Sequence, residues 1–392
     1  MPVPDDDPTG ARIKEQRRLA HLSQRQLADR LPYSYSLLNQ VECGARRATG
    51  DFIEAVADIL GIDAALLTGA NPDGVRPGGI AAVVAPIREA LDIYDLEPLY
   101  GPDPRPADVL SAEADRVCQL VRAARLRKAT SILPDVITEL TCLAWASPAT
   151  SVWQALASTY RTAHDITLKL GHPDLSQVAL DRMYWAAERA SDPHFAAVRQ
   201  YKRALLYKAG SHGVGLRLIA EGLQLLEGET TREALAVSGQ LHLGASALAA
   251  RAGQYGLVDT HLASARGLAA RVGGEAPEVH WLSFGNRNTD LHTFGAAVAM
   301  RHYDDALSQA RSMQVPPSTL TSRRARFLVD RARAEMETGH PDASLRHLAQ
   351  ARRAAPEQTR YYPGTRETIS GLVHLGRRMP DSLGHLARWV GI

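Results

Sequence analysis

The stretch from Leu22 to Gly44 constrains the fold of this chain more than any other, because it predicts two short helices joined by a tight turn. Ser23 has a side chain that N-cap positions prefer, and the apolar pair Leu27-Ala28 follows it. The dipeptide Pro32-Tyr33 then interrupts the first helix, since proline cannot continue the backbone hydrogen bonds of a helix. The first helix is therefore short and is followed at once by a turn.

A second helix begins after Ser34, which is again a favourable N-cap residue. Gly44 ends it in the manner of a left-handed helix stop. Between them, three apolar residues fall on one face at helical spacing, namely Leu37, Leu38 and Val41. Such a helix pair, set among basic residues, is typical of a helix-turn-helix motif whose second helix enters the major groove of DNA.

The spacing of these residues resembles a lambda-repressor-like domain of the XRE family. The resemblance covers about residues 10–69 and is carried by Leu22-Ser23-Gln24-x-x-Leu27-Ala28, Ser34-x-Ser36-x-Leu38-x-x-Val41-Glu42-x-Gly44 and Leu60-Gly61-Ile62. It implies a domain of five helices. We expect the first helix to begin near Thr9 and bury Ile13 and Leu19, the fourth to run from Asp51 to Leu60, and Asp63 to cap the fifth.

The distribution of charge singles out the same region. The whole chain carries a net charge of only +2, but the stretch from Ala11 to Arg47 carries +5, which leaves −3 for the rest. This predicts that phosphate contacts are confined to the N-terminal domain. The alternative is an ordinary solvated helix surface, which the helix-turn-helix spacing disfavours.

Other features of the sequence favour a cytoplasmic protein. The three cysteines are too few and too scattered for a disulfide framework or a thiolate metal site. The N-terminus begins with an acidic stretch and shows no secretory signal, and no apolar run is long enough to cross a membrane. The fourteen histidines are spread singly, so we predict neither a metal site nor a cofactor.

Beyond the N-terminal domain, the sequence predicts helices arranged in pairs. Between the predicted helices of a pair, a turn glycine recurs at Gly171, Gly210, Gly253 and Gly339, and a similar turn around Arg301 has no glycine. Successive turns are about 37 to 49 residues apart, which is near or above the roughly 34-residue period of tetratricopeptide repeats. We therefore expect an all-α chain in which a tetratricopeptide-like α-solenoid follows the DNA-binding domain. A non-repetitive helical bundle is the alternative.

These observations divide the chain into four parts. Residues 1–8 are expected to be a disordered lead-in and residues 9–69 the helix-turn-helix domain. Residues 70–79 are rich in turn-forming residues and predict a linker, and residues 80–392 form the helical repeat domain. The sequence Ile80 to Leu96 could form one helix, although Pro86 interrupts its first half.

The resemblance also implies which side chains contact DNA. Tyr35, Ser36, Asn39 and Gln40 would face base edges from the second helix, while Gln24 would meet a phosphate. Additional contacts near the cap and with the backbone are expected from Ser34, Arg18, Arg25, Arg46 and Arg47. Arg17 and Glu42 occupy positions where the family forms a partly buried ion pair; the alternative is two independent surface charges.

The turn and the second helix also depart from the family pattern. Pro32 stands where glycine is usual, and Tyr33 where a small aliphatic residue is usual. No arginine or lysine lies between Ser34 and Val41, so the arginine–guanine contact is absent from this helix. We therefore expect a sequence specificity that is modest, that favours A·T pairs, or that depends on the shape of the DNA.

The repeat body predicts a concave face suited to an effector. Its inward positions are polar with cationic members, which suits a peptide or an anionic small molecule; the candidates are Arg161, Gln200, Tyr207, Gln240, Arg287, Asn288, His292 and Arg326. No phosphate-binding glycine loop, His-Glu-x-x-His or Gly-x-Ser-x-Gly motif occurs, so we do not expect an enzyme.

The combination of domains is similar to that of actinobacterial transcription regulators. It implies a cytoplasmic homodimer that binds double-stranded DNA at a two-fold operator and responds to a peptide or small-molecule effector, without a membrane association. The alternative is a tetratricopeptide-type interaction scaffold whose helix-turn-helix motif no longer binds DNA usefully.

Overall fold

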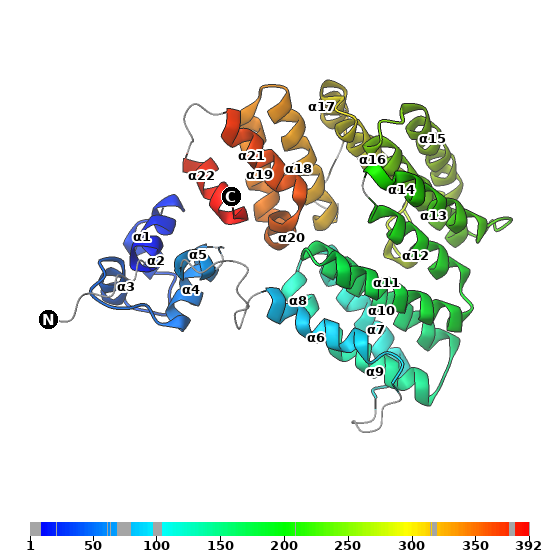
Figure 1. Ribbon diagram of the computed structural model, residues 1–392, viewed down its shortest axis with the longest axis horizontal. Coiled ribbons are helices and arrows are strands. Elements are labelled where there is room, and N and C mark those ends of the chain that lie inside the picture. The colour runs from blue at the N-terminus through cyan, green and yellow to red at the C-terminus, as the bar shows by residue number, and fades with distance from the viewer. Residues whose placement is uncertain are drawn as a thin grey trace. The chain divides into compact units, whose positions relative to one another are not determined.

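The computed structural model of the chain is all-α, which confirms the predicted fold class (Figure 1). It describes residues 9–20, 22–60, 62, 64–68, 80–96, 104–207, 209–313, 315, 320–375 and 381–391, and no strand forms among them. The expected lead-in at 1–8, the linker at 70–79, Gly61, the Asp63 cap and the Leu19 side chain lie outside the described part of the chain. None of the described helices is both long enough and apolar enough to cross a membrane.

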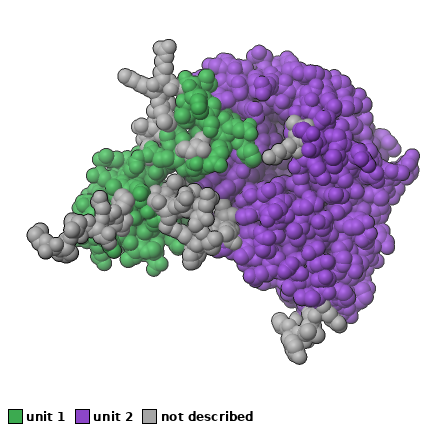
Figure 2. All heavy atoms as spheres, in the orientation of Figure 1, with its two compact units in different colours: residues 1–77, 363–392 green, residues 78–362 purple. Residues whose placement is uncertain are grey.

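The chain forms two compact units, shown in different colours in Figure 2. Unit 1 contains residues 1–77 and 363–392, and unit 2 contains residues 78–362. The sequence predicts a repeat domain that extends to residue 392, whereas the last segment of the chain belongs to the unit of the N-terminal helices. The physical reason is that the C-terminal helix packs against the first helix of the chain.

Unit 1 contains the five N-terminal helices that the sequence predicts, together with two C-terminal ones. The bounds are α1 (Thr9–Leu19), α2 (Gln24–Ala28), α3 (Tyr35–Glu42), α4 (Gly50–Leu60), α5 (Ala64–Thr68), α21 (Pro363–Leu375) and α22 (Asp381–Val390). Helix α1 packs against α3, α4, α5 and α22. Its centre contributes Ile13 to the buried core, as predicted.

Side-chain caps fix where the two short helices of unit 1 begin. The Ser23 hydroxyl accepts a hydrogen bond from the backbone N–H of Gln26, and the Gln26 side chain accepts one from the Ser23 N–H. The Ser34 hydroxyl accepts from the Leu37 N–H at the start of α3. Gly44 follows α3 with φ +77°, a conformation that suits glycine. These predicted caps and the predicted stop are confirmed.

The named elements of unit 2, in the part of it that the structure describes, are all helices. Helix α6 continues through Pro86, so the proline does not end it. The bounds are α6 (Ile80–Asp92), α7 (Ala107–Arg122), α8 (Leu126–Thr130), α9 (Leu133–Ala146), α10 (Thr150–Lys169), α11 (Pro173–Ala190), α12 (Pro193–Leu205), η1 (Ala209–Ser211), α13 (His212–Gln224), α14 (Arg232–Arg251), α15 (Tyr255–Val272), η2 (Val279–Trp281), α16 (Asn286–Ala299), α17 (Tyr303–Ser312), α18 (Thr321–Glu337), α19 (Pro341–Ala354) and α20 (Pro356–Tyr361).

One turn recurs between paired helices of unit 2. Gly171, Gly253 and Gly339 have φ of +86°, +70° and +80° at the ends of α10, α14 and α18. Arg301 takes the same left-handed conformation, with φ 65°, between α16 and α17, where the sequence has no glycine. Gly210 differs, because it lies within η1. The repeated turn makes consecutive helices pack as hairpins, an arrangement consistent with a solenoid.

Helices from the beginning and from the end of unit 2 are in contact with each other. Helix α18 packs against α7, and three small side chains, Ala124, Ala325 and Ala355, form a buried cluster there. A carboxylate oxygen of Glu357 accepts hydrogen bonds from the N–H groups of Leu126 and Arg127, at 2.8 and 3.2 Å. The ends of the helix array are therefore joined rather than left open.

Candidate nucleic-acid interface

Helix α3 presents a polar face outward. The Tyr35 residue is 49% exposed, and Ser36, Asn39 and Gln40 are also exposed. On the opposite face Leu38 and Val41 are buried. Because the exposed residues are spaced as i, i+1, i+4 and i+5, they share one side of the helix. The structure thus presents together, on the surface, the four side chains expected to face base edges.

A buried ion pair joins α1 to the last turn of α3. The Arg17 Nε donates to Glu42 Oε1 at 2.6 Å, and Arg17 Nη2 donates to Glu42 Oε2 at 2.7 Å. Arg17 Nη1 also donates to the backbone carbonyl of Leu22 at 2.8 Å. The hydrogen bonds to Glu42 hold the pKa of Arg17 above its ordinary value. The two residues that the resemblance paired are therefore brought together, rather than lying as independent surface charges.

Gln24 extends this pair into a network that reaches the exposed face of α3. Its amide Nε2 donates to Glu42 Oε2 at 2.8 Å and lies 3.4 Å from Asn39 Oδ1. Its Oε1 accepts a hydrogen bond from the Tyr35 hydroxyl at 3.2 Å. Gln24, expected to meet a phosphate, here bonds within the protein and positions the side chains of Tyr35 and Asn39.

Two contacts that sequence reasoning missed also fix α3. A Cβ added at Gly10 of α1 would overlap the backbone carbonyl oxygen of Val41, so the two helices approach as closely as glycine permits. In the turn, the Tyr33 ring packs against the Phe52 ring of α4, with centroids 5.1 Å apart. The unusual tyrosine in the turn thus contributes an aromatic contact to the core.

Unit 1 carries exposed cationic side chains close to α3 in sequence. The predicted backbone contacts Arg18, Arg25, Arg46 and Arg47 are all exposed. Ser34 is exposed as well, and its hydroxyl serves as the cap of α3. Guanidinium groups at such positions attract the phosphates of a duplex without reading its sequence.

The predicted effector residues of unit 2 separate into two groups. Arg161, Gln240 and Asn288 are buried, and each makes hydrogen bonds inside the protein. Gln240 Nε2 donates to the Tyr201 hydroxyl at 2.8 Å, and Asn288 Nδ2 donates to Gln240 Oε1 at 3.0 Å. These three are placed to stabilise the fold. The others are half-buried or exposed: Gln200, Tyr207, Arg287, His292 and Arg326.

Arg326 is exposed but already has partners. Its Nε donates to Asp330 Oδ2 at 2.8 Å, and its guanidinium lies 4.1 Å from the centroid of the Tyr362 ring. Arg287 contributes its backbone N–H to a carboxylate oxygen of Glu275 at 3.0 Å. Burial lowers the pKa of His292 to about 3, which keeps its ring neutral at physiological pH. The cationic character predicted for this face thus comes from the arginines.

A cluster of half-buried charges around the buried Arg161 was not predicted. Asp165 accepts a hydrogen bond from Lys202 Nζ at 2.6 Å and pairs with Arg161 at 3.3 Å. Lys169 Nζ donates to Gln358 Oε1 at 2.8 Å, and burial lowers the pKa of Lys169 to about 8. Arg161, Asp165 and Lys169 follow one another at i, i+4 and i+8 on α10, whereas Lys202 of α12 and Gln358 of α20 come from other helices, so helical spacing could have indicated only the part of the cluster on α10.

The comparisons with known proteins concern the N-terminal domain. Residues 9–68 match the family described as a helix-turn-helix domain, so the chain carries such a domain at its N-terminus. Two proteins of Mycobacterium tuberculosis, from strains CDC 1551 / Oshkosh and H37Rv, each named an uncharacterized HTH-type transcriptional regulator, are similar to this chain. Each is 41% identical over 58 residues, which is 15% of this chain and 41% of the relative. The chain thus spans less than half the length of these relatives. No solved structure matches the chain.

Proposed function

We propose that the chain is a transcription regulator that binds double-stranded DNA through the exposed face of α3. The observation that carries the proposal is that Tyr35, Ser36, Asn39 and Gln40 point outward from a helix fixed by the buried pair of Arg17 and Glu42. Helix-turn-helix proteins read bases with residues near the start of such a helix. The names of the relatives support this reading.

The side chains of α3 favour A·T pairs in the proposed complex. Asn39 and Gln40 offer the amide geometry that bonds adenine at two atoms, and Tyr35 offers a ring for a thymine methyl group. No cation of α3 is available for guanine. Because a single domain reads only a half-site, the chain acts as a homodimer on a two-fold operator.

A selection from random DNA duplexes with the full chain tests this function. The expected result is an enriched two-fold sequence, bound with an affinity that falls steeply with salt. Arg25→Ala and Arg46→Ala should each reduce the slope of log K against log salt by ~0.9. Arg271→Ala is the matched control, since it removes an exposed arginine from α15 in unit 2. If no duplex is retained even at low salt, DNA binding is excluded.

We further propose that unit 2 takes an anionic small-molecule effector. A hollow of about 570 Å³ lies between α17, α18 and α19, within the size range of ligand sites. Its lining combines cationic with apolar side chains, among them Arg324, Arg331, Arg353, Met313, Phe327 and Leu328. This hollow suits an effector better than the buried Gln240 and Asn288 do, since those amides already bond each other. In this role the chain acts as a cytoplasmic regulator rather than an enzyme.

The anionic dye 1-anilinonaphthalene-8-sulfonate is a suitable probe of this hollow. We expect saturable fluorescence and, at saturation, a changed affinity of the full chain for the selected DNA. The double variant Arg324→Ala/Arg353→Ala should bind the dye more weakly, while Arg271→Ala should match the wild type. Equal dye affinity in the double variant would place the effector elsewhere.

An interaction scaffold is the second candidate function. It is favoured by the lack of any arginine or lysine between Ser34 and Val41, which removes the strongest base contact from α3. The DNA selection separates the two functions, because a scaffold enriches no sequence.

A further inference from the structure

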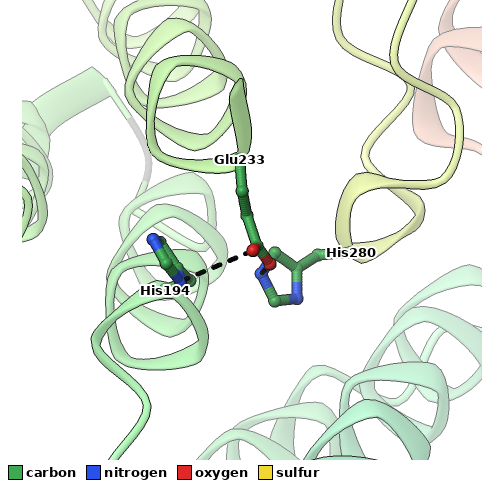
Figure 3. Close-up of side chains that lie close together, drawn as sticks. All are labelled: His194, Glu233 and His280. Atoms are coloured by element: carbon green, nitrogen blue, oxygen red, sulfur yellow. Dashed lines mark ion pairs between the residues drawn. The ribbon is translucent and has the colours of Figure 1, made fainter. Parts of the chain in front are cut away.

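Three side chains with metal-binding chemistry converge in unit 2 (Figure 3). His194 is the second residue of α12, Glu233 is the second residue of α14, and His280 belongs to η2. One donor atom from each lies within 4.8 Å of the others. The helix-turn-helix domain contributes nothing to this cluster, so it is independent of DNA binding.

The distances between the donor atoms suit a small divalent cation. Ligands about 2.1 Å from a tetrahedral ion lie ~3.4 Å from one another. Here His280 Nε2 lies 2.7 Å from Glu233 Oε1, and His194 Nδ1 lies 3.9 Å from Glu233 Oε2. The two values lie on either side of the ideal separation, so the three donors are already close to the spacing that one ion requires.

The orientation of His194 is set by a second carboxylate. Its Nε2 lies 3.0 Å from Glu229 Oε2, and since a carboxylate only accepts, the imidazole carries its proton on Nε2. In the neutral ring the lone pair is then on Nδ1, the atom nearest to Glu233. Histidines that bind metal ions are commonly held in this way by a carboxylate on the other ring nitrogen.

His280 supplies an independent sign of a missing partner. Its side chain is only 7% exposed, and its Nε2, although near Glu233, makes no hydrogen bond of acceptable geometry. The rings of His280 and Phe195 pack edge to face, with their centroids 4.4 Å apart. A buried imidazole nitrogen that faces a carboxylate without a well-aligned hydrogen bond is unfavourable, and a cation coordinated by both groups would satisfy it.

The backbone around His280 is held in place from other helices. His280 and Trp281 have φ of 40° and 54°, values that cost free energy for residues other than glycine. Arg122 Nη1 of α7 donates to the Trp281 carbonyl at 2.6 Å, and Arg323 Nη2 of α18 donates to the Leu282 carbonyl at 2.6 Å. These contacts fix the position of the His280 ring relative to α12 and α14.

We propose that His194, Glu233 and His280 bind a divalent transition-metal ion, with zinc(II) as its representative, and leave a fourth position open. Two imidazoles and one carboxylate select ions of this class over magnesium and calcium, which prefer oxygen ligands. Glu229 and Asp192, whose Oδ1 lies 3.7 Å from His194 Nδ1, add negative charge around the ion. The sequence indicated no such site, because the three ligands lie far apart along the chain.

Equilibrium dialysis of the EDTA-treated full chain against zinc chloride tests the proposal. We expect one zinc ion per chain, a raised melting temperature with zinc, and no rise with magnesium. His194→Ala and Glu233→Gln should each weaken zinc binding at least tenfold, and Glu229→Gln by about 10- to 100-fold through loss of the orienting bond. His302→Ala, an exposed histidine of the same unit, is the matched control.

Cobalt(II) provides a readout that folding defects cannot imitate. Bound at these ligands, it should give the visible absorption of a four- or five-coordinate ion in the wild type and in His302→Ala. The bands should be lost in Glu233→Gln, whose circular dichroism spectrum shows whether the helices are retained. Failure of the wild type to bind zinc, or unchanged binding in the double variant His194→Ala/His280→Ala, would overturn the proposal.

Discussion

Glu42 contacts Arg17 with both of its carboxylate oxygens, at 2.6 and 2.7 Å, across 25 positions of the sequence. The pair is nearly inaccessible, with side-chain exposures of 8% for Arg17 and 1% for Glu42. It therefore fixes the end of α3 to α1, while the start of α3 is fixed by its Ser34 cap. The helix proposed to read DNA is held at both ends.

Removing one partner of this pair should loosen α3. Arg17→Ala leaves the Glu42 carboxylate buried without its cation, a change that costs about 3–5 kcal/mol in comparable cases. Hydrogen exchange, measured by mass spectrometry, should become faster across α1 and α3 of the full chain. Arg25→Ala, an exposed arginine of α2, is the control and should exchange like the wild type. Equal exchange in both variants would contradict a stabilising role for the pair.

Gly10 should tolerate no side chain. Gly10→Ala places a methyl group against the Val41 carbonyl oxygen, so α1 and α3 must separate, at a cost of about 1–3 kcal/mol. Gly50→Ala is the matched control, because nothing lies within 4 Å of its added Cβ. Hydrogen exchange of α3 is again the measurement. If the two alanine variants behaved alike, the close approach of the helices would not matter.

The sequence predicted the five N-terminal helices of unit 1 because their boundaries depend on local chemistry. Ser23, Ser34 and Gly44 act within a few residues of themselves, and the structure places each where its side chain or backbone requires. The packing between helices was less accessible. Nothing local in the sequence indicated that Gly10 must contact Val41, or that Arg388 of α22 pairs with Glu15 of α1.

The same limit applies to the candidate sites of unit 2. The sequence indicated Gln240 and Asn288 as candidate effector contacts, but it could not show that these two amides bond each other. The cluster of His194, Glu233 and His280 depends on three separate elements meeting in space. Periodicity predicts which face of a helix is buried, whereas only the tertiary fold determines which polar side chains meet.

Substitutions on α3 should change specificity without changing the number of phosphate contacts. Gln40→Ala is expected to reduce discrimination at one A·T pair by about 1–3 kcal/mol and to leave the salt slope unaltered. Competition between single-base variants of the selected duplex measures this. Gln119→Ala, at an exposed position of α7, is the control. A uniform loss of affinity for all duplexes would instead assign Gln40 to backbone contact.

Acid should destabilise unit 2 through His164. This side chain is 1% exposed, and burial lowers its pKa to about 4. The negative charge of Asp165 opposes this shift, whereas the positive charges of Lys202 and Arg161 lower the pKa further. Between about pH 6.5 and 4 the unfolded chain therefore binds a proton that the folded chain excludes. Stability is full above pH 6.5 and should fall by up to ~1.4 kcal/mol per pH unit below it.

Urea unfolding at pH 7.5 and pH 5.0, followed by tryptophan fluorescence, measures this pH dependence. His164→Gln removes the titrating group, although it also disturbs the contact between His164 Nδ1 and Ser176 Oγ at 2.7 Å. The variant is therefore expected to be less stable at pH 7.5 and to lose less stability on acidification. A loss equal to that of the wild type would assign the acid sensitivity to other groups.

The contact that joins the ends of unit 2 should depend on Glu357. Its carboxylate caps α8 from 231 positions away, by accepting from the N–H groups of Leu126 and Arg127. Glu357→Ala removes both bonds and should cost about 1 kcal/mol, the usual effect of losing an N-cap. Hydrogen exchange should become faster in α8 and α20 but not in α14 or α15. Glu337→Ala, which removes an exposed carboxylate at the end of α18, is the matched control. Similar exchange in the two variants would show that the Glu357 contact does not stabilise the ends.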